Sequence, residues 1–334
     1  MLKKKYTIEK ITDEYGVKKN IKVDVNMSLY RYRSINQYTI NAFINDEIYG
    51  SLPISFNDPY DCSFTYDKSE LEKYLCENNF KIEQLDEFID SLNSKKAFWI
   101  ASFTEKIDST IMWAHYANSS TGFALEYKFG DLYISGESIK EEQKRLLKEI
   151  IKYSNTVLEL TTGKKIFEKM NVNESIDRGI DIIPSIAPVE YTNKKSNIDA
   201  FVKKMIDNMT NNVIQESNDL NQKIDNINQI SINEELRNIR EQKLAEILFF
   251  KESNWKYEKE WRLLKQNISL DGFAYNMHEK IISLKPVAIY LGEYISKYDE
   301  IVLTNIAKEK KISVYKMKTI YKKDRLELRA YLTS

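Results

Sequence analysis

Residues 254–262 of this chain, NWKYEKEWR, contain the pattern from which its fold and site can best be predicted. Two carboxylates, Glu258 and Glu260, lie two positions apart between aromatic residues. Residues two apart on a β-strand point to the same face, so both acids would enter one site. Like charges on one face repel each other, and a sequence selected only for stability would avoid them. The alternative interpretation is an exposed edge strand with ordinary surface charges.

The composition excludes some classes of protein. The chain has 50 basic and 50 acidic side chains and therefore no net charge. This balance argues against broad nucleic-acid binding driven by charge, but it permits a local basic patch. The low content of glycine (nine) and proline (five) indicates a globular protein with long helices rather than a disordered chain.

Cysteine and apolar residues indicate the compartment. Cys62 and Cys76 are too few for a disulfide framework or an ordinary four-ligand zinc site, which favours a reducing environment. The N-terminal residues are basic but lack the apolar segment of a signal peptide, and no stretch approaches about 18 apolar residues. We therefore expect a cytoplasmic protein without membrane contact.

Patterns along the chain predict an α+β fold with a central mixed or antiparallel sheet. Residues 1–27 are expected to form an N-terminal arm, and residues 28–334 a single catalytic-like domain. Apolar patterns predict strands at residues 28–34, 98–104, 121–127, 188–191, 260–264, 287–291, 312–318 and 326–332. Helices are expected at residues 36–49, 68–93 and 108–117, and a helical insertion at about 138–250.

Two pairs of polar residues on predicted strands are candidates for ligand binding. Arg31 and Arg33 alternate with tyrosines, and arginine binds phosphate through two parallel hydrogen bonds. Ser102 and Thr104 share a face at the end of a buried strand and could hydrogen-bond a sugar. Each pair also has a structural interpretation, namely a solvated strand face for the arginines and a strand-end turn for the hydroxyl groups.

Further candidates lie in a turn and in a short helix. The turn at residues 57–61, NDPYD, could orient a ligand or hold a metal ion, although asparagine, aspartate and proline are also ordinary turn residues. His115 is a candidate general base beside Tyr116, although a core or capping histidine is the commoner outcome. The sequence contains no GxSxG, HExxH or Walker motif and no glycine-rich phosphate loop.

Seven short motifs carry a resemblance to known proteins. They are LYRYRS, SFNDPYD, SFTE, MWAHYA, GFALEY, YEKEWR and VAIYLG, in this order. Together they resemble a widespread, uncharacterised family of bacterial proteins with NDPxD, MWxHYA and ExEWR motifs, over residues 28–128 and 249–293. The order of arginine, Ser-x-Thr and Glu-x-Glu on three strands is also similar to the arginine-serine-glutamate class of ADP-ribosyltransferases.

The second resemblance implies an ADP-ribosyltransferase core that uses NAD as its substrate. It implies that Arg31 or Arg33 holds the NAD phosphates and that the Ser102 strand shapes the nicotinamide pocket. The expected NAD-binding residues are Arg31, Arg33, Asn57, Asp58, Ser102, Thr104, His115 and Tyr116.

The same resemblance implies that the two acids are catalytic. Glu260 would hold the ribose and stabilise an oxocarbenium-like state, because a nearby carboxylate stabilises developing positive charge. Glu258 would orient the acceptor, a macromolecule of unidentified kind. The bacterial family further implies a toxin or a phage-defence effector, and the proposed chemistry needs no metal.

Two other functions fit the same residues. A non-enzymatic sensor or binding module would use the helical insertion to bind a partner protein. A metal-dependent nuclease or phosphodiesterase would use four acids, Asp58, Asp61, Glu258 and Glu260. The transferase hypothesis requires that residues 29–33, 98–104 and 260–264 meet in one sheet.

Overall fold

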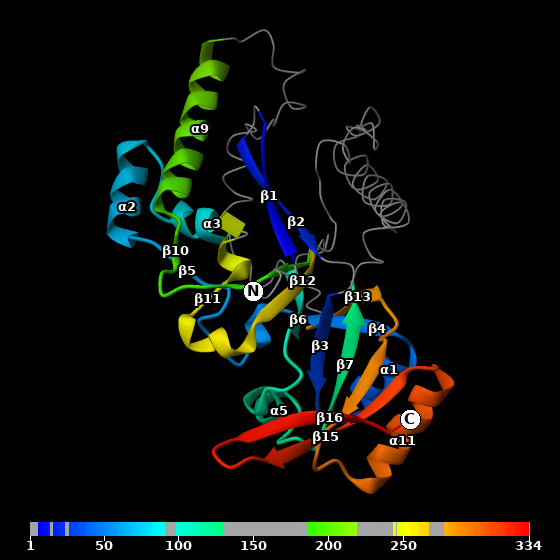
Figure 1. Ribbon diagram of the computed structural model, residues 1–334. Helices are drawn as coiled ribbons and strands as arrows, with labels where there is room; N and C mark the ends of the chain where they lie inside the picture. Colours follow the sequence, from blue (N-terminus) through cyan, green and yellow to red (C-terminus); the bar gives the residue numbers. More distant parts are fainter. Residues whose placement is uncertain are drawn as a thin grey trace, which may run out of the picture.

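The computed structural model of the chain is built around a ten-stranded sheet (Figure 1). The structure describes residues 6–13, 16–23, 27–90, 98–129, 186–218, 243–244, 246–266 and 277–333. The strands follow the order β13 (His278–Ser283), β4 (Glu47–Ser51), β6 (Phe98–Thr104), β3 (Ser28–Arg33), β7 (Phe123–Lys128), β14 (Ala288–Leu291), β15 (Ser313–Tyr321) and β16 (Leu326–Leu332). Strand β12 (Glu260–Gln266) lies between β6 and β8 (Ile186–Pro188).

The pairing within this sheet is mostly antiparallel. Strands β14 and β15 are the exception and run parallel, because helix α11 (Lys297–Glu309) connects them as a crossover. Strands β3, β6 and β12 belong to the same sheet, so the predicted meeting of the three motif-bearing segments is confirmed. The observed helices and mixed sheet also confirm the α+β class.

Three helices cover the two faces of the sheet. Phe43 of α1 (Gln37–Ile44) and Leu303 of α11 pack into one core with the apolar residues of β6, β7 and β14. Trp113 of α5 (Thr110–Tyr116) packs into a second core on the opposite face. Each helix begins at a capping residue whose side chain accepts a backbone N–H, namely Asn36, Ser109 and Ser296.

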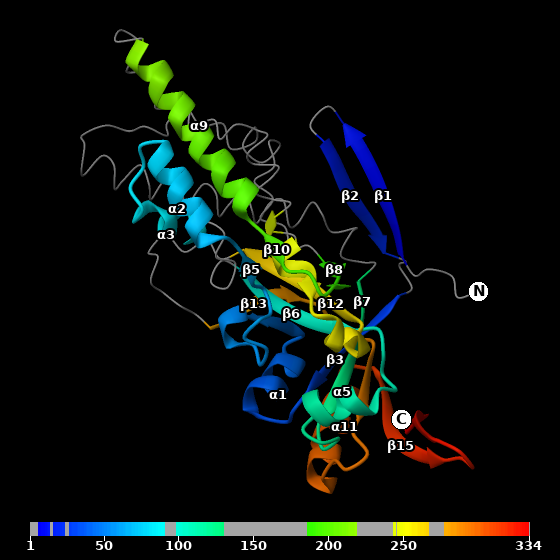
Figure 2. The ribbon, with the colours of Figure 1, turned by 90° about the vertical axis from the view of Figure 1, so that its left-hand side faces the viewer.

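The remaining described helices form a separate layer. They are α2 (Lys68–Glu77), α3 (Gln84–Asp90) and α9 (Asp199–Asn218), and they share a third core with the outer end of β6 (Figures 1 and 2). The Tyr74 hydroxyl of α2 donates to Asp207 of α9 at 2.6 Å. None of the described helices is long and apolar enough to cross a membrane.

Short elements complete the described chain. Strands β1 (Tyr6–Asp13) and β2 (Gly16–Val23) pair as an antiparallel hairpin. Two parallel bridges join β5 (Phe64–Thr65) to β10 (Ser196–Asn197) and β9 (Glu190–Tyr191) to β11 (Phe250–Lys251). Single turns of 3₁₀ helix are η1 (Pro53–Ser55) and η4 (Ser253–Glu258).

Strand β6 is the branch point of the sheet. Its β12 edge is paired along its whole length, from Phe98 to Thr104. On the other edge, β4 pairs only at Ile100 and β3 pairs only at Thr104. Residues 101–103 of β6 are therefore paired with neither β4 nor β3. These two strands diverge from β6 at the two ends of this three-residue stretch. This opening is where the candidate site lies.

Several predicted elements have different bounds in the structure. The helix expected at residues 36–49 ends at Ile44, because Asp46 adopts a left-handed conformation (φ 56°) and the chain returns as strand β4. The helix expected at residues 68–93 is two helices, separated at Asn79, which also has a positive φ of 63°. The strand expected at residues 188–191 divides at Val189 between β8 and β9. The predicted helix at about 138–172 lies outside the described residues.

Gly122 occupies a position where a side chain would strike the backbone. A Cβ atom there would lie 2.1 Å from the carbonyl oxygen of Arg33 and 2.9 Å from that of Ala117. We predict that Gly122→Ala lowers the free energy of unfolding by about 2–4 kcal/mol. Gly50→Ala is the milder comparison, because the nearest atom, at 2.5 Å, is the flexible end of Ile281, and the nearest backbone atom, the nitrogen of Ile100, lies at 3.0 Å. Chemical denaturation of both variants checks this, and equal losses would contradict it.

Candidate active site

A cavity of about 280 Å³ opens between β3 and β6. Strand β3 contributes Tyr30, Arg31, Tyr32 and Arg33 to its wall, and β6 contributes Ile100, Ser102, Phe103 and Thr104. Lys251, Glu258 and Glu260 line the cavity as well. The rest of the lining is Ser51, Ser55, Phe56, Asn57, Asp61, Met112 and Tyr116. Segments far apart in the sequence thus meet at the branch point of the sheet.

The two acids enter the cavity by a different backbone path from the one predicted. Glu258 ends the 3₁₀ helix η4 and only Glu260 lies on strand β12, so the expected shared strand face is wrong. Lys259 between them is left-handed (φ 45°, ψ 50°) and turns the chain into the strand. The carboxylates nevertheless converge, because Lys251 Nζ lies 2.6 Å from Glu258 Oε2 and 3.0 Å from Glu260 Oε2.

Glu260 is held by neighbours on both sides. Ser102 Oγ donates to Glu260 Oε1 at 2.7 Å, as expected for diagonal neighbours on the paired strands β6 and β12. Arg262 Nε donates to the same oxygen at 2.9 Å, and its Nη2 reaches Glu260 Oε2 at 3.2 Å. The backbone N–H of Glu260 donates to the Tyr191 hydroxyl at 2.8 Å. The carboxylate is therefore fixed in orientation, with a hydroxyl of the cavity wall bound to it.

Arg262 is fully buried and links separate parts of the chain. Its Nη2 donates to Asp61 Oδ2 at 2.6 Å, and its Nη1 donates to the carbonyl oxygen of Leu248 at 2.6 Å. The Nη1 group also lies 3.4 Å from Cys62 Sγ. One guanidinium thus joins strand β12, the turn at residues 57–61 and the segment before β11.

Burial and charge move the pKa values of the two acids in opposite directions. Burial raises the pKa of Glu258, and its contact with Lys251 only partly offsets this. Burial would also raise the pKa of Glu260, but Arg262 and Lys251 outweigh it and lower the pKa to about 2. Burial would lower the pKa of Lys251, yet Glu260 and Glu258 raise it above its usual range. Glu260 is therefore the permanent anion, and Glu258 is the more basic carboxylate.

The two arginines of β3 are cations without a carboxylate partner among the described residues. Arg31 is 8% exposed, donates to the carbonyl oxygen of Tyr49 and lies 5.5 Å from the centre of the Phe103 ring. Burial, followed by the charge of Arg33, lowers the pKa of Arg31 well below its usual value. Burial lowers the pKa of Arg33 to about 10. Arg31 is buried and Arg33 is half-buried, so an anion in the cavity would offset their charge.

The NDPYD turn contributes one of its acids to the network. Asp58 is buried, but its Oδ1 accepts the N–H of Tyr60 at 2.8 Å, so it closes the turn and does not line the cavity. Asp61 instead binds Arg262 and lies 3.7 Å from Lys251 Nζ. Asn57 lines the cavity. The carboxylate of Asp58 is thus used by the backbone of the turn, and its contact with NAD stays a prediction.

Helix α5 presents its tyrosine to the cavity and its histidine elsewhere. The Tyr116 hydroxyl donates to Glu258 Oε1, and Thr104 Oγ1 donates to the backbone carbonyl of Glu258. His115 is exposed and is not part of the cavity wall, because adjacent residues of a helix point to different sides. The structure therefore does not bring His115 to this cavity, and its contact with NAD stays a prediction.

Two residues of the site were not predicted. Arg262 follows Glu260 by two residues and therefore shares its face of the strand. The ExEWR motif thus contained the pattern that predicts a place for Arg262 beside Glu260. Lys251 lies on the two-residue strand β11, which has no pattern of its own. Among the described residues, no three His, Cys, Asp or Glu side chains are arranged to hold a metal ion. The Lys251 ammonium is instead the cation that lies between the clustered carboxylates.

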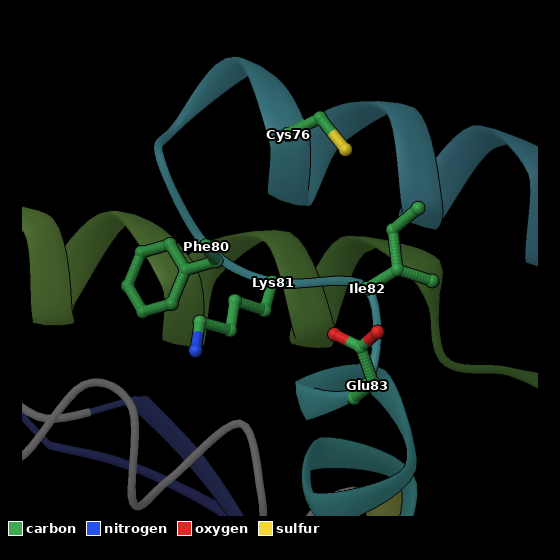
Figure 3. Close-up of a pocket in the computed structure, with 5 residues that line it drawn as sticks. All are labelled: Cys76, Phe80, Lys81, Ile82 and Glu83. Carbon is green, nitrogen blue, oxygen red and sulfur yellow. The ribbon is translucent and has the colours of Figure 1, made fainter.

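A second, open pocket lies at the turn between α2 and α3 (Figure 3). Its wall is Cys76, Phe80, Lys81, Ile82 and Glu83. Figure 3 shows these side chains spread along the turn rather than converging on one point. It shares no lining residue with the cavity at β6 and gathers no set of catalytic groups.

Part of the chain is similar to an uncharacterised protein family. Residues 112–263 match a family model described as "Protein of unknown function (DUF2971)". The matched segment includes most of α5, all of β7, Lys251, Glu258 and Glu260, but not the arginines of β3. No curated protein and no solved structure matches the chain. The comparisons therefore assign no activity.

Removal of Arg262 should leave two buried carboxylates without their main counterion. We predict that Arg262→Met lowers the free energy of unfolding by about 3–5 kcal/mol, because Glu260 and Asp61 stay buried. Arg325→Met is the matched control, since Arg325 is exposed and its pair with Glu327 should contribute less than about 1 kcal/mol. Urea denaturation measures both. A loss below about 1 kcal/mol for Arg262→Met would show that the network is not structural.

Acid should weaken the fold through Glu260. Its pKa is about 2 in the folded chain and 4.5 in the reference state, so its contribution is complete above pH 4.5 and is lost as the pH falls towards 2. Between pH 5 and pH 3 this amounts to about 2 kcal/mol. Urea denaturation across this range should show a shallower loss for Glu260→Gln than for the parent. Glu258→Gln should not make this loss of stability shallower than in the parent, because the pKa of Glu258 is raised rather than lowered.

Proposed function

We propose that this protein is an NAD-dependent ADP-ribosyltransferase-like enzyme whose active site is the cavity at β6. The observation that carries the proposal is the charge pattern of its walls. Two arginines that have no carboxylate partner among the described residues line the same cavity as a pair of acids, one of which is hydrogen-bonded to Ser102. NAD has the matching pattern, with an anionic diphosphate and a cationic nicotinamide ring.

The size of the cavity supports binding of one half of the dinucleotide. A volume of about 280 Å³ is just below the usual size of ligand pockets, which occupy roughly 300–1,000 Å³. The nicotinamide ribose would lie inside, beside the hydrogen-bonded pair of Ser102 and Glu260, and the adenosine half would lie outside. Arg33 is the better candidate for the diphosphate clamp, because Arg31 already donates to the Tyr49 carbonyl. Tyr30 and Tyr32 offer aromatic surfaces for the nicotinamide ring.

The two acids have different environments and would do different work. In the proposed reaction the bond from ribose C1′ to nicotinamide nitrogen breaks, and nicotinamide leaves as a neutral molecule with the bonding electron pair. The permanently charged Glu260 stabilises the positive charge left on the ribose. The acceptor oxygen or nitrogen then attacks C1′, and its proton passes to Glu258, whose raised pKa makes it the stronger base. With water as acceptor the product is ADP-ribose.

A non-enzymatic binding module is the second candidate. The observation that favours it is the neutralisation of Glu260 by both Arg262 and Lys251, which reduces the charge available to a ribose cation. Such a module would keep the anion-binding arginines and lack turnover. Thermal stabilisation by NAD without release of nicotinamide would identify this case. Stabilisation by Mg²⁺ alone would instead support a metal-dependent nuclease or phosphodiesterase.

We predict that Glu260→Gln lowers nicotinamide release from NAD by about 100-fold or more, because it removes the charge opposite the ribose but retains the size of the side chain. Chromatographic detection of nicotinamide checks this. Binding is followed separately by the shift of melting temperature with NAD. Glu260→Gln should retain that shift, whereas Arg33→Gln should lose it.

Two controls keep the interpretation open to refutation. Glu258→Gln should reduce transfer to an acceptor more than hydrolysis, because Glu258 is assigned to the acceptor. His115→Gln should leave both rates unchanged, since its side chain lies outside the cavity. If the parent shows neither NAD-dependent stabilisation nor nicotinamide release, the enzyme proposal fails. If Glu260→Gln matches the parent in turnover, Glu260 is not catalytic.

A further inference from the structure

The β15–β16 hairpin is an exposed ribbon at the end of the sheet. Strand β16 pairs with β15 and with no other described strand. Figure 2 shows the tip of the hairpin projecting away from the rest of the chain. Side chains near the tip are well exposed, including Tyr321 at 80% and Leu326 at 62%. This ribbon is therefore accessible to a large partner.

The charge of the hairpin departs from that of the whole chain. Residues 313–333 contain six basic side chains and two acidic ones, whereas the whole chain is neutral. The basic residues are Lys316, Lys318, Lys322, Lys323, Arg325 and Arg329. The ribbon is thus a local basic patch on a protein without net charge, and its positive potential would be felt mainly by a partner that docks there.

The strand register places several of these cations on one face of the hairpin. Lys318 is paired directly with Arg329, and Lys316 with Tyr331, so these four side chains share a face. The alternate residues point to the other face, where Met317 is buried in the core beneath α5. Like charges directly opposite each other destabilise a hairpin. Glu327 offsets part of the charge of Arg329, and an anion docked on this face would offset the remaining positive charge.

A single carboxylate pairs with three cations near the tip of the hairpin. Glu327 lies 2.6 Å from Lys322 Nζ, 2.7 Å from Arg325 Nη2 and 2.7 Å from Arg329 Nη2. Hydrogen bonds from Lys322 and Arg329 lower the pKa of Glu327 to about 2. Three cations around one anion leave a positive excess, and the shared carboxylate keeps them close together.

An aromatic ring lies within the basic face. Tyr331 is 42% exposed, and Lys318 Nζ lies 5.7 Å from the centre of its ring. Aromatic side chains between cations are the pattern used to bind single strands, where bases stack on the ring and phosphates meet the cations. Paired bases are not available for such stacking.

We propose that the basic face of the β15–β16 hairpin binds single-stranded nucleic acid, with Lys318, Arg329 and the Glu327 cluster on the phosphates and Tyr331 stacked on a base. The proposal goes beyond the NAD reaction and does not depend on it. It also differs from binding driven by overall charge, because it confines the contact to one ribbon of a neutral chain.

The test is binding of fluorescent 20-nucleotide RNA and DNA single strands to the full chain, followed by anisotropy at several salt concentrations without NAD. Each phosphate contact to a single strand should add about −0.7 to the salt slope. Lys318→Gln/Arg329→Gln should weaken binding on the order of 10-fold or more and reduce the slope by about 1.4. The matched control is Lys68→Gln/Lys73→Gln, which removes two exposed cations from α2 and should bind like the parent.

The stacking contact is tested by a second matched pair. Tyr331→Leu should weaken binding of single strands by about 5-fold or more without changing the salt slope, because stacking involves no counterion. Tyr321→Leu alters an exposed tyrosine on the opposite face of the hairpin and should have no effect. Circular dichroism confirms that all variants are folded.

Three results would overturn the proposal. Absence of binding at about 50 mM salt would mean that the cations only protect the edge strand from pairing with other chains. Equal loss in the α2 control would mean that binding is not located on the hairpin. Equal affinity for polyglutamate, with no effect of Tyr331→Leu, would identify an acidic protein as the partner instead.

Discussion

The buried guanidinium of Arg262 is the contact on which the site depends. It bonds to Glu260, Asp61 and the Leu248 carbonyl, so it joins three segments that are separate in the sequence. Burying this charge costs free energy that only complete pairing can offset. The result is that Glu260 cannot rotate or move away from Ser102. Such fixed orientation is what electrostatic catalysis requires, because the charged groups need not reorganise during the reaction.

Charges of both signs line the cavity. The acids and their counterions lie on η4, β12 and β11, whereas the two arginines that have no carboxylate partner among the described residues lie on β3. A ligand with a single charge would satisfy only one of these groups. A ligand with an anionic and a cationic end would satisfy both charges, and this is the reason for proposing a pyridinium dinucleotide rather than a simple phosphate.

Much of this arrangement could be predicted from the sequence, although one assumption about the backbone between the two acids is wrong. Alternation at Glu258 and Glu260 predicted that both acids share a site, and they do converge on Lys251. The assumed common strand is wrong, because Lys259 adopts a left-handed conformation that residue patterns do not reveal. Strand β6 and the capped helix α5 were predictable from their apolar runs and from Ser109.

Residues whose roles depend on distant contacts were less predictable. Lys251 lies on a strand of two residues that exists only because β9 lies beside it, and no local pattern marks it. Asp58 and Asp61 are equivalent in the turn motif, and only the position of Arg262 separates their roles. His115 was assigned to the ligand through proximity in sequence to Tyr116, whereas the helix directs it outward.

The unpaired stretch of β6 between β4 and β3 has one more consequence. Residues 101–103 form a sheet edge inside the molecule, bordered by two diverging strands. An edge on the surface, such as β16, can be extended by any chain with a free strand. An enclosed edge admits only a partner small enough to enter the cavity. The fold can therefore keep backbone hydrogen-bonding groups available at its centre without the risk of aggregation, and a ligand there would complete the sheet rather than lie upon it.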